Sequence, residues 1–181
     1  VARGEHHLEE VADDGRVEVL GAVDGTLAAT VDLSDGSLDR GVRGVAFASS
    51  DVVAATTPRC VVLFAGATGA VVKRLALDRP ATALTAAGGI AVVGAAAGAG
   101  ALLVVDGAKT TKLSAPGAVC ALALHASRYA AGCLDGAVRI YGDAVTTWAS
   151  FQAPVRVVAF SDSGWLLAAG GRALACVEPG L

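Results

Sequence analysis

The 181-residue sequence contains no methionine, few aromatic residues and few charges, and each shortage narrows what the protein can be. Because no initiator methionine precedes Val1, we expect a processed chain or a piece of a longer protein. Aromatic residues make up only 4%, so valine, alanine and leucine must build the core. No charged segment followed by an apolar one opens the chain, so no secretory signal is expected.

Positive charge is scarce and scattered. Lysine and arginine number 14 against 17 acidic residues, which gives a net charge of −3. Proteins that bind nucleic acid non-specifically neutralise phosphates with clustered lysine and arginine, and no basic block occurs here. We therefore expect no nucleic-acid partner.

The four cysteines are Cys60, Cys120, Cys133 and Cys176. No two of them form a C-x-x-C pair, and their spacings fit no zinc site. Each cysteine lies in an apolar segment, where it acts as a small hydrophobic residue. We expect buried free thiols, no bound metal and a reducing, cytoplasmic location.

What the sequence does have is a repeated pattern of apolar strand, tight turn and apolar strand. In "AAGCLDGAVRIY", residues 130–141, an Asp-Gly turn joins two such strands. The same pattern occupies residues 8–25, 53–69, 90–107 and 166–180. The predicted turns there are Asp13-Asp14-Gly15, Thr57-Pro58-Arg59, Gly98 to Gly100, and Gly170-Gly171-Arg172.

The repeat has a period of about 40 residues, which is typical of β-propeller blades. The last apolar residues of the second hairpin strands mark this period: Leu20, Phe64, Val105, Tyr141 and Val177. An apolar strand precedes most hairpins, at residues 42–47, 81–86, 118–124 and 155–160. A more polar strand follows, at residues 26–33, 70–77, 109–115 and 144–151. The predicted fold is an all-β propeller of about four and a half four-stranded blades, with units 1–38, 39–78, 79–115, 116–151 and 152–181.

These repeats resemble those of WD40 proteins. "VRVVAFSDSGWLLAAGG" (155–171) matches the first half of that family's blade pattern, and "AAGCLDGAVRIY" matches the second half. Asp14 and Asp135 stand at the turn aspartate, and Tyr141 stands at the tryptophan position. The family's Gly-His dipeptide and its tryptophan are missing, so we expect apolar packing in place of the usual Asp-His-Ser/Thr-Trp network. Seven blades would need roughly 280 residues, so we expect an incomplete or fragment propeller.

The resemblance implies a rigid platform that binds other proteins through its turns and strand ends. The predicted protein-binding residues are Asp13, Arg59, Leu134, Trp148 and Trp165. Packing of both tryptophans between blades is the alternative, and we expect Asp14 and Asp135 to cap their turns. We expect a non-enzymatic scaffold or adaptor with no catalytic residue, cofactor or small-molecule substrate.

Several alternatives stay open. The order of segments from residue 78 to 171 also resembles actin-interacting WD40 proteins that assist cofilin, which makes actin a possible partner. A propeller enzyme with a central-channel site is another possibility. "EHHLEE" (5–10) supplies too few ligands for a metal site, and "GAAAGAG" (94–100) lacks the helix that follows a phosphate loop. Residues 80–105 carry no charge and could span a membrane only as a helix, which their glycines disfavour, so no membrane contact is expected.

Overall fold

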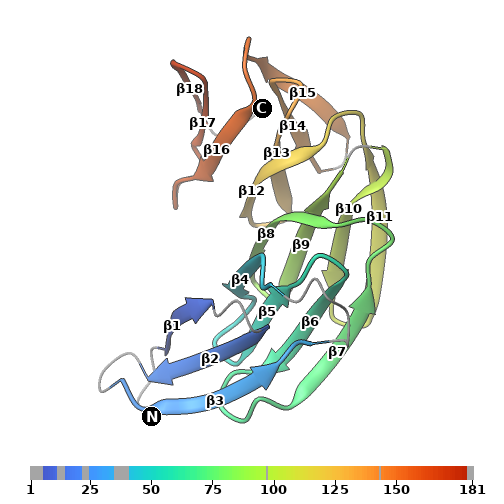
Figure 1. Ribbon diagram of the computed structural model, residues 1–181. Coiled ribbons are helices and arrows are strands. Elements are labelled where there is room, and N and C mark those ends of the chain that lie inside the picture. The colour runs from blue at the N-terminus through green and yellow to red at the C-terminus, as the bar shows by residue number, and fades with distance from the viewer. Residues whose placement is uncertain are drawn as a thin grey trace. The chain divides into compact units, whose positions relative to one another are not determined.

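The described part of the computed structural model is built from β-strands joined by short turns, without a helix (Figure 1). It comprises residues 6–11, 15–21, 25–34, 41–96, 98–142 and 144–178. The strands form five separate antiparallel sheets of three or four strands. The chain divides into two compact units, Val1–Ala81 and Thr82–Leu181, which we describe in turn.

The first unit holds two sheets. The first sheet has the order β1-β2-β3, and the second has the order β4-β5-β6-β7. Their strands are β1 (His6–Val11), β2 (Arg16–Gly21), β3 (Leu27–Asp32), β4 (Gly44–Phe47), β5 (Val52–Thr56), β6 (Cys60–Ala65) and β7 (Val71–Ala76). One apolar cluster, with Val19, Val31, Val53 and Phe64 among its buried members, joins the two sheets.

The second unit holds three sheets, ordered β8-β9-β10-β11, β12-β13-β14-β15 and β16-β17-β18. The first has β8 (Ala81–Ala87), β9 (Ile90–Ala95), β10 (Gly98–Asp106) and β11 (Lys109–Ala115). The second has β12 (Val119–His125), β13 (Arg128–Cys133), β14 (Ala137–Tyr141) and β15 (Val145–Ser150). The third has β16 (Val155–Phe160), β17 (Leu166–Gly170) and β18 (Ala173–Val177).

In every sheet each strand pairs with its neighbour in the sequence, which is the strand order of a propeller blade. The predicted inner, central and outer strands occur in this order, and the chain has an all-β, propeller-like fold of repeated sheets. The predicted Gly-rich turn near Gly98 to Gly100 lies in the connection between β9 and β10, because the innermost pair of these strands is Gly94 with Leu102. Gly98 also pairs with Ala115 of β11 across a bulge, so the end of this connection already belongs to β10.

The predicted turns at Asp135-Gly136 and Gly171 have the expected backbone. Gly136 has a φ of 84° and Gly171 a φ of 60°, values that glycine adopts without strain. A Cβ on Gly136 would also clash with the carbonyl oxygen of Phe151. Glycine is therefore required where β13 turns into β14.

Neighbouring sheets of the second unit approach each other closely at small residues. A Cβ on Gly94 of β9 would lie 2.5 Å from Val119 at the start of β12. A Cβ on Gly132 of β13 would lie 2.6 Å from Val155 at the start of β16. The second strand of one sheet thus touches the first strand of the next through a repeated glycine–valine contact.

Two apolar clusters fill the interfaces of this unit. One surrounds Leu102 and Tyr141, and the other surrounds Ile140 and Leu166. The central strands are buried almost throughout, whereas the outer strands β11 and β15 are mostly exposed. This burial agrees with the continuous apolar runs and the more polar outer strands of the sequence.

Candidate functional site

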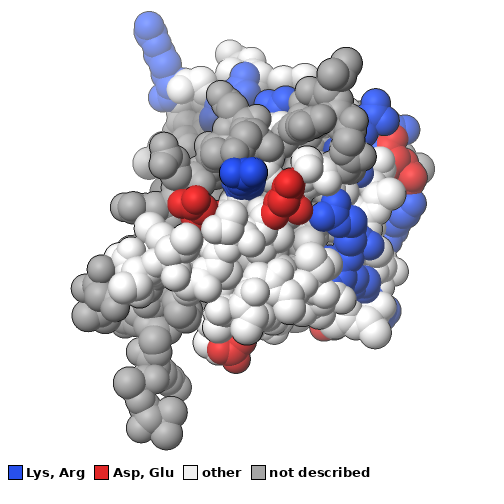
Figure 2. All heavy atoms as spheres, turned by 60° about the horizontal axis from the view of Figure 1, so that its bottom comes forward, with Lys and Arg blue, Asp and Glu red and all other residues white. Residues whose placement is uncertain are grey.

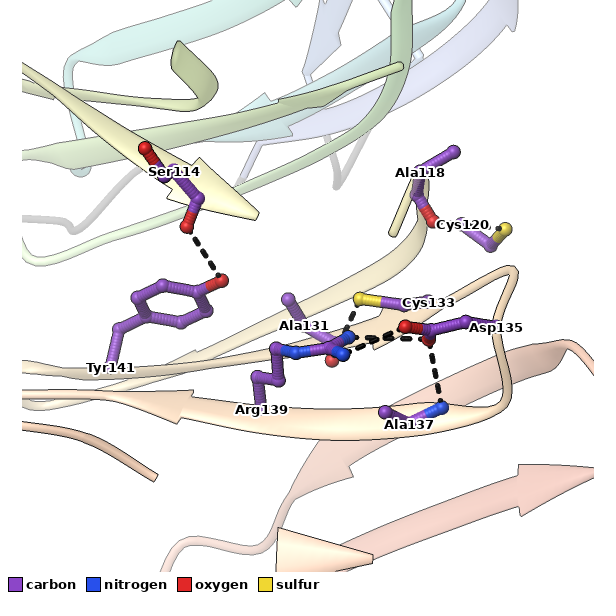
Figure 3. A network of polar contacts seen from close by, with 9 residues as sticks. All are labelled: Ser114, Ala118, Cys120, Ala131, Cys133, Asp135, Ala137, Arg139 and Tyr141. Carbon is purple, nitrogen blue, oxygen red and sulfur yellow. Dashed lines mark hydrogen bonds and ion pairs between the residues drawn. The ribbon is translucent and has the colours of Figure 1, made fainter. Parts of the chain in front are cut away.

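The turn between β13 and β14 is held by a charged pair at its centre (Figure 3). The Asp135 carboxylate accepts two hydrogen bonds from the Arg139 guanidinium, at 2.7 and 3.2 Å, one to each oxygen. The same carboxylate accepts the Ala137 N–H at 3.0 Å. Asp135 therefore caps its own turn, as predicted, and also orients the arginine four residues later.

Asp135 and Arg139 form an ion pair that is partly exposed to solvent. The side chain of Arg139 is 12% exposed and that of Asp135 is 40% exposed. The hydrogen bonds from Arg139 hold the pKa of the Asp135 carboxyl below its usual value, and those bonds raise the pKa of Arg139 in return. Both groups are charged at neutral pH, and the pair presents no net charge.

Cys133 lies next to the Arg139 guanidinium in Figure 3 and is fully buried. Burial raises the pKa of its thiol, and the neighbouring Arg139 opposes this effect without cancelling it. Cys60 is buried as well, but Cys120 is half-buried and Cys176 is exposed, so the prediction of four buried thiols is wrong for these two. All four cysteines are free thiols.

Backbone hydrogen bonds fix the same turn from both sides. The Leu134 N–H donates to the Ala118 carbonyl at 2.8 Å, and the Phe151 N–H donates to the Gly136 carbonyl at 2.8 Å. Gly117 leaves room for the aspartate, because a Cβ there would lie 2.8 Å from the Asp135 carboxyl carbon. On this frame the side chain of Leu134 is 53% exposed.

Tyr141 connects this sheet to the preceding one. Its hydroxyl donates to the Ser114 carbonyl of β11 at 3.3 Å, and its ring stacks on Tyr129 with centroids 5.9 Å apart. The ring is buried, which raises the pKa of the phenol. Polar contacts thus accompany the apolar packing that the sequence predicts for the blades.

Arg59 lies in the turn between β5 and β6 of the first unit. A side-chain oxygen caps this turn too, but it belongs to a threonine and not to an aspartate. The buried Thr57 hydroxyl accepts the N–H groups of Arg59 at 3.3 Å and Cys60 at 3.1 Å. Arg59 itself is exposed. It borders a pocket of about 190 Å³, whose other lining residues are Pro58 and residues 77–80. Both turns between second and third strands therefore present an exposed side chain on a fixed backbone.

The two tryptophans differ in their surroundings. Trp148 on β15 is partly buried against the cluster around Ile140 and Leu166, as the packing alternative predicted. Trp165 is 39% exposed and lies at the end of the turn between β16 and β17, directly before Leu166. Leu134 and Trp165 lie at opposite ends of their sheets, because Gly132 meets Val155 at the start of β16. The structure does not bring them into one surface, and Asp13 lies outside the described residues.

A second hollow, of about 400 Å³, opens beside the Trp165 turn. It is lined by the turn after β12 and by residues near the end of β16: His125, Ala126, Ser127, Arg128, Phe160, Ser163 and Gly164. The His125 Nε2 lies 3.2 Å from the Asp162 carbonyl oxygen, so this nitrogen carries the proton and donates it. The ring also packs on Phe160 with centroids 5.7 Å apart, so the histidine ties the two turns together.

Sequence reasoning missed Arg139 as the partner of the turn aspartate. The signal was available in "LDGAVRIY", because Asp135 and Arg139 are four residues apart across a tight turn. Alternation along β14 alone does not bring them together; the turn does, by folding the carboxylate back over the strand. In the described residues no group of three or more histidine, cysteine or acidic side chains could hold a metal.

Comparisons with solved structures show the same fold. The computationally designed protein Ika8 is 21% identical, with a TM-score of 0.72 over 93% of this chain and 56% of its own. The designed protein Ika4 is 19% identical, with a TM-score of 0.69 over 83% of this chain and 97% of its own. A chain from the crystal structure of the Mitotic Checkpoint Complex is 13% identical, with a TM-score of 0.69 over 88% of this chain and 56% of its own.

The likeness concerns the fold alone, since all three identities are low. The chain spans just over half the length of the first and third of these proteins. No protein-family profile matches the sequence, and no curated protein matches it. Residues 80–105, which a membrane alternative required to be helical, form β8, β9 and most of β10. Among the described residues no helix is long and apolar enough to cross a bilayer.

Proposed function

We propose that the protein is a non-enzymatic, cytoplasmic scaffold or adaptor that binds other proteins through the turns between second and third strands. The observation that carries this proposal is Leu134, an exposed leucine held on a turn that Asp135, Arg139 and two backbone hydrogen bonds make rigid. An apolar side chain on a rigid turn binds without the cost of ordering the backbone when a partner covers it. Loops on a rigid frame are where such proteins place recognition.

The charges around the turn also support protein binding. Asp135 and Arg139 neutralise each other, so a partner that covers Leu134 does not have to compensate an isolated charge. Most of the described residues on the face shown in Figure 2 are uncharged, and the charged side chains among them include both signs. Such a surface suits a protein partner better than a polyanion.

The test compares capture of partners by the wild-type chain and by Leu134→Asp. We expect at least one partner to bind the wild type and to lose about tenfold or more in affinity for the variant, as for an interface hot spot. Leu27→Asp is the matched control, because Leu27 is 58% exposed in the other unit and should leave binding unchanged. Equal loss with both variants would contradict a specific role for the turn.

Actin is the first purified partner to try, because of the sequence resemblance described above. Co-sedimentation with filaments, with and without cofilin, tests it directly. Filament binding that Leu134→Asp weakens and Leu27→Asp does not would support both the partner and the surface. Wild-type chain that stays in the supernatant would exclude actin and leave the scaffold proposal to the wider search.

A further inference from the structure

The hollow beside the Trp165 turn has no part in the proposed function. We call it the β12–β16 hollow, because its walls are the turn between β12 and β13 and the end of β16 with the turn that follows it. Its volume of about 400 Å³ lies within the range of small-ligand pockets, roughly 300–1,000 Å³. It lies at turns between first and second strands, whereas Leu134 lies at a turn between second and third strands. A ligand can therefore occupy it whether or not a partner covers Leu134.

The two walls of the β12–β16 hollow are held at a fixed spacing. His125 in the first wall donates its Nε2 proton to the Asp162 carbonyl in the second at 3.2 Å, and its ring packs on Phe160. The second wall is also fixed internally, because the Ser161 hydroxyl oxygen accepts the Trp165 N–H at 3.0 Å. A preformed site of this kind loses less conformational entropy when it binds a ligand.

The first wall turns at Ala126, whose backbone is strained. Its φ is 53°, in the left-handed region that glycine favours, and no other non-glycine residue in the described part of the chain has a positive φ. Backbone strain of this kind clusters at active sites and at turns that hold a ligand. The residues that this turn presents are Ser127 and Arg128, which follow Ala126 directly, are exposed and line the hollow.

The polar side chains of the hollow can donate hydrogen bonds, and its arginine carries a permanent positive charge. The Arg128 guanidinium has five N–H groups, enough to serve a ligand alongside contacts within the chain. Ser127 adds a hydroxyl from the same wall, and Ser163 adds one from the opposite wall. The Ser163 oxygen lies 3.0 Å from that of Ser161, so when Ser161 donates, the Ser163 proton is available to a ligand. None of the described lining residues is acidic, and the hollow therefore suits an anion.

The chemistry of the lining favours a carboxylate over other anions. A planar guanidinium binds a carboxylate through two parallel hydrogen bonds, and each of the two groups carries a single charge. A phosphate monoester carries a charge of about −1.5 to −2 at pH 7, and one arginine lines the hollow. Phe160 adds an apolar wall, against which a short aliphatic stem can be buried.

From this combination we propose that the β12–β16 hollow binds a carboxylate carried on a short aliphatic stem. The Arg128 guanidinium binds the two carboxylate oxygens, and the hydroxyls of Ser127 and Ser163 donate to them from the two walls. The stem lies against the Phe160 ring. Two sources supply this chemistry, the glutamate side chain of a partner protein and a small aliphatic carboxylic acid.

The test is an NMR titration of the full, ¹⁵N-labelled chain, with the backbone N–H signals of residues 126–128 and 163–164 as reporters. The first probe is the tripeptide glycine–glutamate–glycine with both termini blocked, so that its one charge is the side-chain carboxylate. We expect the reporters to shift with a Kd of about 1 mM, as for one exposed ion pair with added hydrogen bonds. The same tripeptide with glutamine in place of glutamate should bind about tenfold more weakly, because its hydrogen bonds are no longer charge-assisted.

Sodium propionate, which reproduces the glutamate side chain alone, separates the two sources. Propionate that binds as tightly as the tripeptide identifies a small carboxylic acid as the ligand. Propionate that binds about tenfold more weakly identifies a glutamate on a partner, because the peptide groups then add to the binding free energy.

Two variants test the residues of the hollow. Arg128→Gln should weaken binding of the glutamate tripeptide about tenfold, and Ser163→Ala should weaken it about threefold, as for one neutral hydrogen bond. Arg156→Gln is the matched control, because Arg156 is an exposed arginine of β16 that does not line the hollow. Signals far from the reporters verify that each variant is folded.

Three outcomes would overturn the proposal. Reporters that do not move up to about 20 mM of tripeptide or propionate would mean that the hollow binds no carboxylate. Equal binding of the glutamate and glutamine tripeptides, or equal loss with Arg128→Gln and Arg156→Gln, would remove the role of the ion pair. Inorganic phosphate that binds more tightly than either carboxylate would show that the anion was wrongly chosen.

Leu134→Asp keeps this proposal separate from the proposed function. That variant should leave the titration unchanged, because Leu134 does not line the hollow. Loss of protein partners with Leu134→Asp and loss of carboxylate binding with Arg128→Gln are therefore independent results, and either proposal can fail without the other.

Discussion

At the scale of single residues, the turn aspartate has a different partner from the one in the WD40 pattern. In the WD40 pattern that the sequence resembles, the aspartate belongs to a network that ends in a tryptophan. Here Asp135 binds Arg139, and Tyr141 at the tryptophan position bonds instead to the Ser114 carbonyl of the neighbouring sheet. These are two separate contacts, one within the turn and one between sheets.

Asp135 should make the stability of the chain depend on pH in a defined direction. Its pKa is lowered in the folded state, so the stability that it contributes is complete above the unfolded pKa of about 4. That contribution is lost as the pH falls through the lower folded pKa. Asp135→Asn should lower the free energy of unfolding by about 1 kcal/mol at pH 7, a modest loss because the carboxylate is partly exposed. Near pH 2 the loss should be much smaller.

Urea unfolding at both pH values measures this difference. Asp51→Asn, in the exposed turn before β5, is the control for a general effect of removing one carboxylate. A loss of stability that is the same at pH 7 and at pH 2 would mean that the amide fails for a reason other than charge.

At the scale of elements, glycines in the second strand of a sheet set the distance to the next sheet. Gly94 and Gly132 occupy equivalent places, and each faces a valine that begins the following inner strand. The resemblance in sequence places these glycines before the turn, but it does not give their reason. Only the packed sheets show that the space for a side chain is taken by Val119 and Val155.

Gly132→Ala should therefore destabilise the chain through crowding. We expect a loss of about 1–3 kcal/mol in the free energy of unfolding, because the added methyl group meets Val155 at 2.6 Å. Gly41→Ala is the matched control, since nothing lies within 4 Å of its Cβ position. Denaturant midpoints of the two variants measure the effect, and equal midpoints would show that the sheets can separate at little cost.

At the scale of the whole molecule, each of the two units has apolar clusters of its own. The cluster around Phe64 lies entirely before Thr82, and the clusters around Leu102 and Leu166 lie entirely after it. A unit that contains its own core can fold independently. The second unit has three sheets and two such clusters, which is enough for a small domain.

We expect a chain of residues 82–178 to fold alone, with a β-type circular dichroism spectrum and one cooperative thermal transition. Residues 82–141 serve as the control, because this shorter chain ends before β16 and β17 and so loses half of the cluster around Leu166. The shorter chain should melt without cooperativity. A longer chain that melts in the same gradual way would contradict independent folding of the unit.

The sequence by itself determined the strands, most of their turns and the period of the sheets, because these depend on apolar runs and on glycine and aspartate at nearby positions. It did not show that Gly98, in the connection before β10, also pairs with Ala115 of β11, because that pairing lies across a bulge. Tertiary structure alone decided that Trp148 is partly buried while Trp165 is exposed, and that Leu134 and Trp165 lie at opposite ends. Both outcomes depend on which strands and turns lie alongside each residue and not on the residue itself.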